Sequence, residues 1–202
     1  MGKSNTWDDH YARRARSEKW LARSVYKLEE IDRKNRLIPP GANLLDLGCS
    51  PGSWSQYALK MTGPRGQVVG VDLTVPKHLS APNFRFVQED VLSLDPNRLV
   101  QEIGNQDLVI SDLAPKTTGI KSADAIRSAE LVRAALRIAQ VLLKPGGHFV
   151  CKVFEGGEVR ELKQEVSKAF GRVRFHRPRA VRKGSREIYL VALNRAGGHP
   201  AS

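Results

Sequence analysis

The sequence predicts an α/β fold with a mostly parallel sheet of seven strands, helices on both faces and an antiparallel last strand. Short apolar segments alternate with segments of helical periodicity along most of the chain, which is typical of a parallel sheet covered by helices. A Gly-x-x-x-Gly turn joins the first predicted strand to a helix. The last two predicted strands are joined by a basic loop without a helix, which favours an antiparallel pair.

The order of these elements follows from the apolar pattern. Apolar runs predict strands over residues 43–47, 67–72, 84–87, 107–111, 148–153, 173–176 and 188–193. Apolar residues at helical spacing predict helices over residues 24–34, 53–61, 96–103, 122–143 and 158–170. Three of these helices are ended by Pro39–Pro40, Gly63–Pro64 and Lys144-Pro-Gly-Gly.

We expect one domain over residues 1–202, with a core at 24–194 and a polar, mobile segment at 1–20. The chain opens without an apolar signal-peptide region, and no apolar run approaches membrane-spanning length, so we expect a cytoplasmic protein. Cys49 and Cys151 cannot form a disulfide framework and lack zinc-binding spacing. Both are expected to be buried.

The formal net charge of +12 is concentrated in two clusters and points to a polyanionic partner. Residues 13–27 hold six basic residues against one acid, and residues 172–186 hold seven and no acid. An anionic membrane is the rival partner, but the second cluster lacks the apolar face of a membrane-binding helix. Nucleic acid is favoured, and the candidate contacts are Arg13, Arg14, Arg16, Arg23, Arg177, Arg179, Arg182 and Lys183.

A turn of small residues follows the first predicted strand. Gly48 allows a tight turn, and Gly52 permits a close backbone approach at the start of the helix. The spacing is not Gly-x-Gly-x-x-Gly, and no Gly-Lys-Ser/Thr follows, which disfavours a phosphate-binding P-loop. Trp54 is expected either beside the pocket or in the core.

Three acids stand at or just after the carboxyl ends of the first three predicted strands. Asp46 suits a cationic amine, Asp72 can hold both ribose hydroxyls of a nucleoside, and Asp90 can accept from an adenine amino group. Any one of them could equally cap a helix or turn, as aspartate commonly does. Three in register behind a glycine turn favour a nucleoside-containing ligand.

The later strands carry candidate catalytic residues. Lys152 lies inside an apolar strand predicted to be internal, where an unpaired ammonium group is costly. Asp112 follows the fourth strand, Lys27 lies on the first predicted helix, and Glu187 precedes the last strand. Two lysines and two acids thus come from four separate parts of the chain.

This order of residues resembles the Lys-Asp-Lys-Glu tetrad of the FtsJ/RrmJ family of ribosomal RNA 2′-O-ribose methyltransferases. The similarity extends from about residue 13 to 193 and includes the segments Ser24-Val-Tyr-Lys-Leu, Asp46-Leu-Gly-Cys-Ser-Pro-Gly-Ser-Trp-Ser-Gln, Ser111-Asp-Leu-Ala-Pro, Lys152-Val-Phe and Ser185-Arg-Glu-Ile-Tyr. One departure is Ser53, where the family commonly has a second glycine. Because Ser53 can cap the following helix, it puts little in doubt.

The resemblance implies a Rossmann-like fold and S-adenosyl-L-methionine as the cofactor, with binding residues Asp46, Gly48, Gly52, Trp54, Asp72, Asp90 and Asp112. It implies methylation of a uridine 2′-hydroxyl in large-subunit (23S) ribosomal RNA, within the subunit or its precursor, by lysine-assisted deprotonation and direct in-line transfer. Lysine is normally charged and a poor base, but burial beside a second ammonium favours its neutral form. We therefore assign Lys152 as the base, oriented by Asp112 and Glu187, and Lys27 as its cationic neighbour or as a holder of the 2′-oxygen.

Other functions are weighed against this one. A 2′-O-methyltransferase acting on transfer RNA or another RNA would use the same residues, whereas a non-catalytic RNA-binding protein on this fold would have no use for Lys152. The basic clusters disfavour a small-molecule substrate. We expect no metal, because the five histidines show no ligand spacing, and we expect a monomer.

Overall fold

The computed structural model describes residues 6–197 and contains a single seven-stranded sheet in the order β3-β2-β1-β4-β5-β7-β6. The strands are β1 (Asn43–Leu47), β2 (Gln67–Asp72), β3 (Phe84–Gln88), β4 (Gln106–Ser111), β5 (Leu143–Phe154), β6 (Phe170–His176) and β7 (Glu187–Arg195). The helices are α1 (Thr6–Ser17), α2 (Val25–Asn35), α3 (Ser53–Thr62), α4 (Pro96–Ile103), α5 (Lys121–Leu142) and α6 (Val159–Ser167).

Five neighbouring strands, β3, β2, β1, β4 and β5, run parallel, and β7 runs antiparallel to both β5 and β6. The predicted α/β class and the antiparallel last strand are therefore confirmed. The chain turns outward from β1 in two directions, to β2 on one side and to β4 on the other. Ligands of such sheets bind at this point, beyond the carboxyl ends of the strands.

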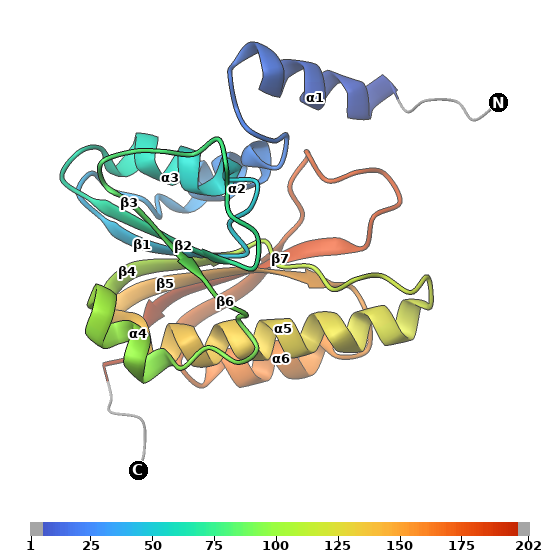
Figure 1. Ribbon diagram of the computed structural model, residues 1–202. Helices are drawn as coiled ribbons and strands as arrows, with labels where there is room; N and C mark the ends of the chain where they lie inside the picture. The colour runs from blue at the N-terminus through green and yellow to red at the C-terminus, as the bar shows by residue number, and fades with distance from the viewer. Residues whose placement is uncertain (1–5, 198–202) are drawn as a thin grey trace.

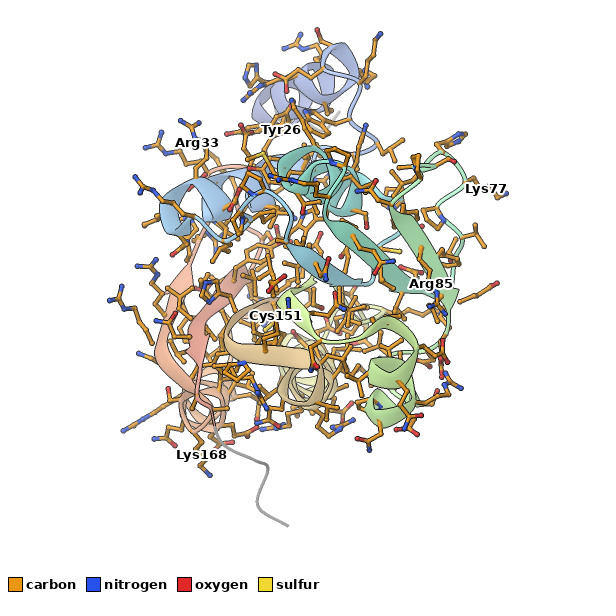
Figure 2. The ribbon with its side chains drawn as sticks, turned by 90° about the vertical axis from the view of Figure 1, so that its left-hand side faces the viewer. Tyr26, Arg33, Lys77, Arg85, Cys151 and Lys168 are labelled. Carbon is orange, nitrogen blue, oxygen red and sulfur yellow. The ribbon has the colours of Figure 1, made fainter. Side chains whose placement is uncertain are left out.

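Two apolar layers enclose the sheet (Figure 1). One face packs against α4, α5 and α6 through residues such as Leu99, Leu136 and Leu162. The other face packs against α2 and α3, with Leu28 and Ala58 completely buried, and α1 lies outside them against α2. Both cysteines are buried, as expected, and Figure 2 shows Cys151 in the interior. Helices on both faces explain why the internal strands are almost continuously apolar.

The N-terminal segment differs from the prediction. Residues 6–17 form helix α1 and are not an unstructured extension, whereas residues 1–5 lie outside the described part of the chain. Ala15 of α1 is buried, and the rings of Tyr11 and Tyr26 lie 5.4 Å apart between α1 and α2. Few apolar residues among many charged ones gave this helix too weak a periodicity to be recognised in the sequence.

Two element boundaries also differ. The predicted helix over residues 158–170 ends at Ser167, and Phe170 instead opens β6, where it pairs with Arg195 and stacks on Phe149 at 6.2 Å. Strand β5 begins at Leu143 and not at residue 148, because Leu143 already pairs with Gln106 of β4. In both places a tertiary partner extends a strand beyond its local signal.

Candidate active site

A cleft of about 550 Å³ opens beyond the carboxyl ends of the parallel strands. Four of the predicted cofactor residues line it, namely Gly48, Asp72, Asp90 and Asp112. The apolar side chains Leu73 and Leu92, which are 64% and 53% exposed, also face it. The cleft therefore combines acidic groups with apolar surface that a bound ligand would cover.

The cleft floor is held in shape by Gly48 and Asp72. Gly48 has φ +78°, and a Cβ there would lie 2.6 Å from the Leu113 side chain, so only glycine fits. Asp72 accepts hydrogen bonds from the backbone N–H groups of Ser50 (3.0 Å) and Thr74 (2.8 Å). Asp72 therefore fixes the turn after β1 and also faces the cleft.

Asp46, in contrast, does not face the cleft. It is completely buried, with Oδ2 accepting from the Ser55 hydroxyl at 2.7 Å and no hydrogen-bond partner for Oδ1 among the described residues. Burial raises the pKa of this carboxyl to about 7, and the nearby carboxylates of Asp112 and Asp72 add to that effect. No surface of the Asp46 side chain is accessible in this structure, and its contact with a ligand amine stays a prediction.

Gly52 and Trp54 also lie away from the cleft wall. A Cβ at Gly52 would lie 2.9 Å from Leu21 and 3.2 Å from Leu79, so two apolar side chains cover this glycine. The Trp54 indole N–H donates to the backbone oxygen of Ser24 at 2.9 Å, and its ring packs on Tyr189 at 5.7 Å. Trp54 thus belongs to the core, where it helps to position the start of α2.

The four predicted catalytic residues come together in one chain of ion pairs. The Lys27 and Glu187 side chains are 2.6 Å apart, the Lys152 ammonium lies 3.0 Å from Asp112 Oδ1, and it lies 4.0 Å from Glu187 Oε2. Lys152 also donates to the backbone oxygen of Asp112 at 3.1 Å. Two ammonium groups and two carboxylates therefore share one mostly buried site, in which their charges balance.

Tyr189 is a fifth member that the sequence pattern did not single out. Its hydroxyl donates to Asp112 Oδ1 at 2.6 Å, and the Lys27 ammonium lies 5.9 Å from its ring centroid. Burial, together with Asp112 and Glu187, raises the Tyr189 pKa well above its usual value, so the hydroxyl stays protonated. Burial would raise the Asp112 pKa, but Lys152, Lys27 and Tyr189 outweigh it and lower that pKa.

A second cavity, of about 290 Å³, lies on the other side of this chain of ion pairs. Lys27 and Glu187 line it together with Ser24, Ser185 and two basic residues, Arg23 and Arg182. Asp112 lines the first cleft, so the ion pairs connect the walls of the two spaces. A group transferred from one space to the other would pass these residues.

The predicted RNA contacts lie on α1, before α2, and in the loop over residues 177–186 between β6 and β7. The first cluster is partly engaged within the protein, because Arg14 pairs with Glu18 at 2.7 Å and Arg23 donates to the Ala180 backbone oxygen at 2.8 Å. Arg13 and Arg16 are exposed on α1. The Arg23 contact ties the segment before α2 to the loop.

Within the loop, Arg179, Arg182 and Lys183 are exposed. Arg177 has a structural task instead: its guanidinium donates to the backbone oxygens of Ser185 and Glu187 and to the Glu155 carboxylate. These contacts close the neck of the loop. Arg177 therefore shapes the loop, and because it is also exposed, its contact with RNA stays a prediction.

In the described residues 6–197, no group of three or more His, Cys, Asp or Glu side chains is arranged to hold a metal ion. No helix there has the length and apolar character needed to cross a membrane.

Known proteins resemble this chain in sequence and in fold. A relative from Bdellovibrio bacteriovorus named ribosomal RNA large subunit methyltransferase E is 48% identical over 190 residues, which are 93% of this chain and 96% of the relative. A relative of the same name from Desulfatibacillum aliphaticivorans is 44% identical over 195 residues, covering 96% of this chain and 94% of the relative.

Solved structures have a similar fold. The crystal structure of a ribosomal RNA methyltransferase from Plasmodium falciparum has a TM-score of 0.78 at 27% identity, covering 89% of this chain and 100% of that one. Aeropyrum pernix fibrillarin, solved with S-adenosyl-L-methionine, shares the fold at a TM-score of 0.56 and 16% identity, over 78% of this chain and 68% of that one. The family model described as FtsJ-like methyltransferase matches residues 20–195, and the chain belongs to that family.

Proposed function

We propose that this protein transfers a methyl group from S-adenosyl-L-methionine to a ribose 2′-hydroxyl of large-subunit ribosomal RNA. One observation carries the proposal: the ion pairs of Lys27, Glu187, Lys152 and Asp112 lie between two cavities. Asp112 borders the cleft that suits the cofactor, and Lys27 and Glu187 border the cavity that suits the acceptor ribose.

The residues of the larger cleft fit the proposed cofactor. Asp72 has lone pairs left for ribose hydroxyls after its two backbone contacts. Leu73 and Leu92 offer apolar surface for an adenine ring, and Asp90, exposed at the same edge, can accept from its amino group. The acidic lining also suits a cationic ligand. When bound, S-adenosyl-L-methionine supplies an electrophilic methyl group on a sulfonium.

The chain's own residues then prepare the acceptor oxygen. Lys27 and Glu187 bind the 2′-hydroxyl from the smaller cavity. Lys152, once it has released a proton to solvent, accepts the hydroxyl proton as the oxygen–carbon bond forms and the bond between the methyl group and sulfur breaks. Asp112 and Glu187 hold Lys152 in place through contacts of 3.0 and 4.0 Å. The pairs are mostly buried, so their electrostatic interactions are stronger than in water.

Ribosomal RNA is the favoured substrate for two reasons. Exposed Arg179, Arg182 and Lys183 lie on the loop that borders the smaller cavity, where a polyanion would pass. The relatives that match over nearly their whole length are named as large-subunit ribosomal RNA methyltransferases. A uridine of 23S RNA is the proposed target, and the enzyme is proposed to act as a monomer in the cytoplasm.

The decisive experiment is incubation with methyl-labelled S-adenosyl-L-methionine and separated RNA pools: purified large-subunit RNA, intact large subunits, small-subunit RNA and transfer RNA. Label confined to a 2′-O-methyl nucleotide of large-subunit RNA supports the proposal. Label in transfer RNA would favour the alternative substrate. Tight RNA binding without any label in any pool would favour a non-catalytic RNA-binding protein.

A further inference from the structure

The basic loop over residues 177–186 is held against helix α2 at both ends. At its carboxyl end, Glu187 pairs with Lys27 of α2 at 2.6 Å. At its amino end, Glu30 of α2 uses both carboxylate oxygens: Oε2 accepts from the Arg179 backbone N–H at 2.8 Å, and Oε1 lies 3.0 Å from His176 Nε2. Lys27 and Glu30 are one helical turn apart, so the same face of α2 holds both ends of the loop.

Glu30 is an acid within a strongly basic surface. It lines a groove of about 550 Å³ between α1, α2 and β6, together with Arg14, Arg33, Lys34 and Arg179. Figure 2 shows Arg33 projecting from α2 at the surface. A carboxylate here weakens the attraction of this surface for a polyanion. Its two contacts, in contrast, fix the part of the loop from which Arg179 projects.

The contact of Glu30 with the Arg179 N–H is not duplicated among the described residues. Arg23 donates to the Ala180 backbone oxygen at 2.8 Å, and the Arg177 guanidinium closes the neck of the loop on the side of Glu187. Neither contact uses the Arg179 N–H. The Lys34 ammonium, also on α2, lies 3.5 Å from the second ring nitrogen of His176. Removal of the Glu30 side chain would therefore release the Arg179 N–H, while the Arg23, Arg177 and Lys34 contacts keep the rest of the loop attached.

We propose that Glu30 is a positioning residue for RNA: it preorganises the basic loop, so that RNA binding does not have to order Arg179 and its neighbours. The inference rests on the proposed function for its ligand. Ordering a loop on binding costs conformational entropy, and a loop that is already ordered avoids this cost. The effect has a distinctive sign, because removal of a negative charge alone would tighten RNA binding.

Three variants distinguish the effect of holding the loop in place from the effect of the negative charge. Glu30→Ala removes the charge and both contacts. Glu30→Asp keeps the charge, but its shorter side chain cannot reach both partners. Glu29→Ala is the matched control: it removes the same charge from the same groove, and the Glu29 side chain makes no hydrogen bond or ion pair with the other described residues.

The measurements are the dissociation constant for purified large-subunit ribosomal RNA at fixed salt and backbone hydrogen exchange over residues 177–186. We expect both Glu30 variants to bind RNA about tenfold more weakly, the effect of removing one hydrogen bond to a charged group. We expect faster exchange in the loop and unchanged affinity for S-adenosyl-L-methionine. The Glu29→Ala protein should bind RNA as tightly as wild type or more tightly.

RNA affinity of the Glu30 variants equal to or above that of wild type would overturn the proposal. If Glu30→Ala fails to bind the cofactor, the RNA affinity of the Glu30→Asp protein tests the proposal instead. That variant keeps the negative charge and changes only the length of the side chain. If residues 177–186 exchange at the same rates in the Glu30 variants as in Glu29→Ala, Glu30 does not anchor the loop. A wild-type protein that methylates no RNA would instead refute the proposed function, so the two failures are distinct.

Discussion

The Tyr189 hydroxyl donates a 2.6 Å hydrogen bond to Asp112, from β7 across to the end of β4. Lys152 and Tyr189 are paired in register on neighbouring strands, so the hydroxyl and the ammonium reach the same carboxylate. This contact explains a polar group in an otherwise apolar strand. It also orients the carboxylate that faces the larger cleft.

Tyr189→Phe should slow methylation without unfolding the protein. The ring would keep its packing on Trp54, while Asp112 would lose one charge-assisted hydrogen bond. We expect single-turnover rates to fall about tenfold, equivalent to about 1.4 kcal/mol. The same contact helps to lower the Asp112 pKa, so the acidic limb of the rate profile should move to higher pH. Unchanged rates and an unchanged profile would make Tyr189 a core residue only.

Asp72→Ala should weaken cofactor binding. The variant lacks an acceptor that faces the cleft and the two hydrogen bonds that hold Ser50 and Thr74. Removal of a charge-assisted hydrogen bond should cost about 1.5–3 kcal/mol of binding free energy. Titration calorimetry with S-adenosyl-L-methionine measures it, with the melting temperature as a control for folding. Full affinity in the folded variant would mean that Asp72 only shapes the turn.

Asp46 should make stability depend on pH. Its folded pKa of about 7 lies above the ordinary value of 3.8, so the folded state binds this proton more tightly than the unfolded state does. The contribution of Asp46 to the free energy of unfolding should therefore be largest at low pH and fall by up to about 4 kcal/mol as pH rises from about 4 to 7. Above pH 7 its contribution should be constant.

The measurement is urea denaturation of wild type and Asp46→Asn from pH 5 to pH 8. Groups distant from Asp46 titrate alike in both proteins, so the difference between the two curves isolates Asp46 together with Asp72 and Asp112, the carboxylates coupled to it. Asp46→Asn should gain stability relative to wild type as pH rises. Parallel curves over this range would show that the buried carboxyl does not titrate there.

The sequence predicted the sheet because its strands are apolar and its helices periodic, and it predicted which strand ends carry acids. It could not predict how deep each side chain lies. Asp46 and Asp72 both end strands, yet Asp46 is completely buried and Asp72 faces the cleft. Depth depends on packing from α3, where Ser55 binds Asp46, and no local pattern reveals that contact.

Tyr189 and Arg177 illustrate the same limit. A tyrosine two residues after Glu187 reads as an ordinary strand residue, although residues two apart on a strand share a face. That spacing was the available signal for a fifth member of the site. Arg177 counted toward the basic cluster by composition, but its guanidinium is engaged by backbone oxygens of the loop. Charge counts do not distinguish free cations from engaged ones.

The exposed part of the basic loop should determine the salt dependence of RNA binding. The combined change of Arg179, Arg182 and Lys183 to alanine should weaken binding and flatten the plot of log affinity against log salt. The slope should fall by roughly 0.7–0.9 for each phosphate that the protein no longer neutralises. Arg177 is left intact because it closes the neck of the loop.

A matched control removes the same charge elsewhere. Arg160, Lys163 and Lys168 are exposed on or just after α6, which covers the opposite face of the sheet. Their combined change to alanine should leave the slope nearly unaltered. If both triple variants flatten the slope equally, net charge and not the loop governs RNA binding.

Lys152 provides the sharpest test of the chemistry. Its side chain is 9% exposed and contacts two carboxylates, so its removal leaves Asp112 with less compensation and should lower the melting temperature. Lys152→Met keeps most of the volume, while Tyr189 still binds Asp112 and Lys27 still pairs with Glu187. Cofactor affinity should persist, because the cleft is lined by other residues.

Single-turnover methylation by Lys152→Met on saturating large-subunit RNA should fall roughly 10²–10⁴-fold, as expected when a general base is removed. Lys152→Arg should not restore the rate, because a guanidinium keeps its proton at any usable pH and cannot accept another. The arginine variant retains the positive charge between Asp112 and Glu187, so it separates proton transfer from electrostatic support. Near-normal turnover with arginine would mean that position 152 has only an electrostatic role. Lys27 would then be the candidate base.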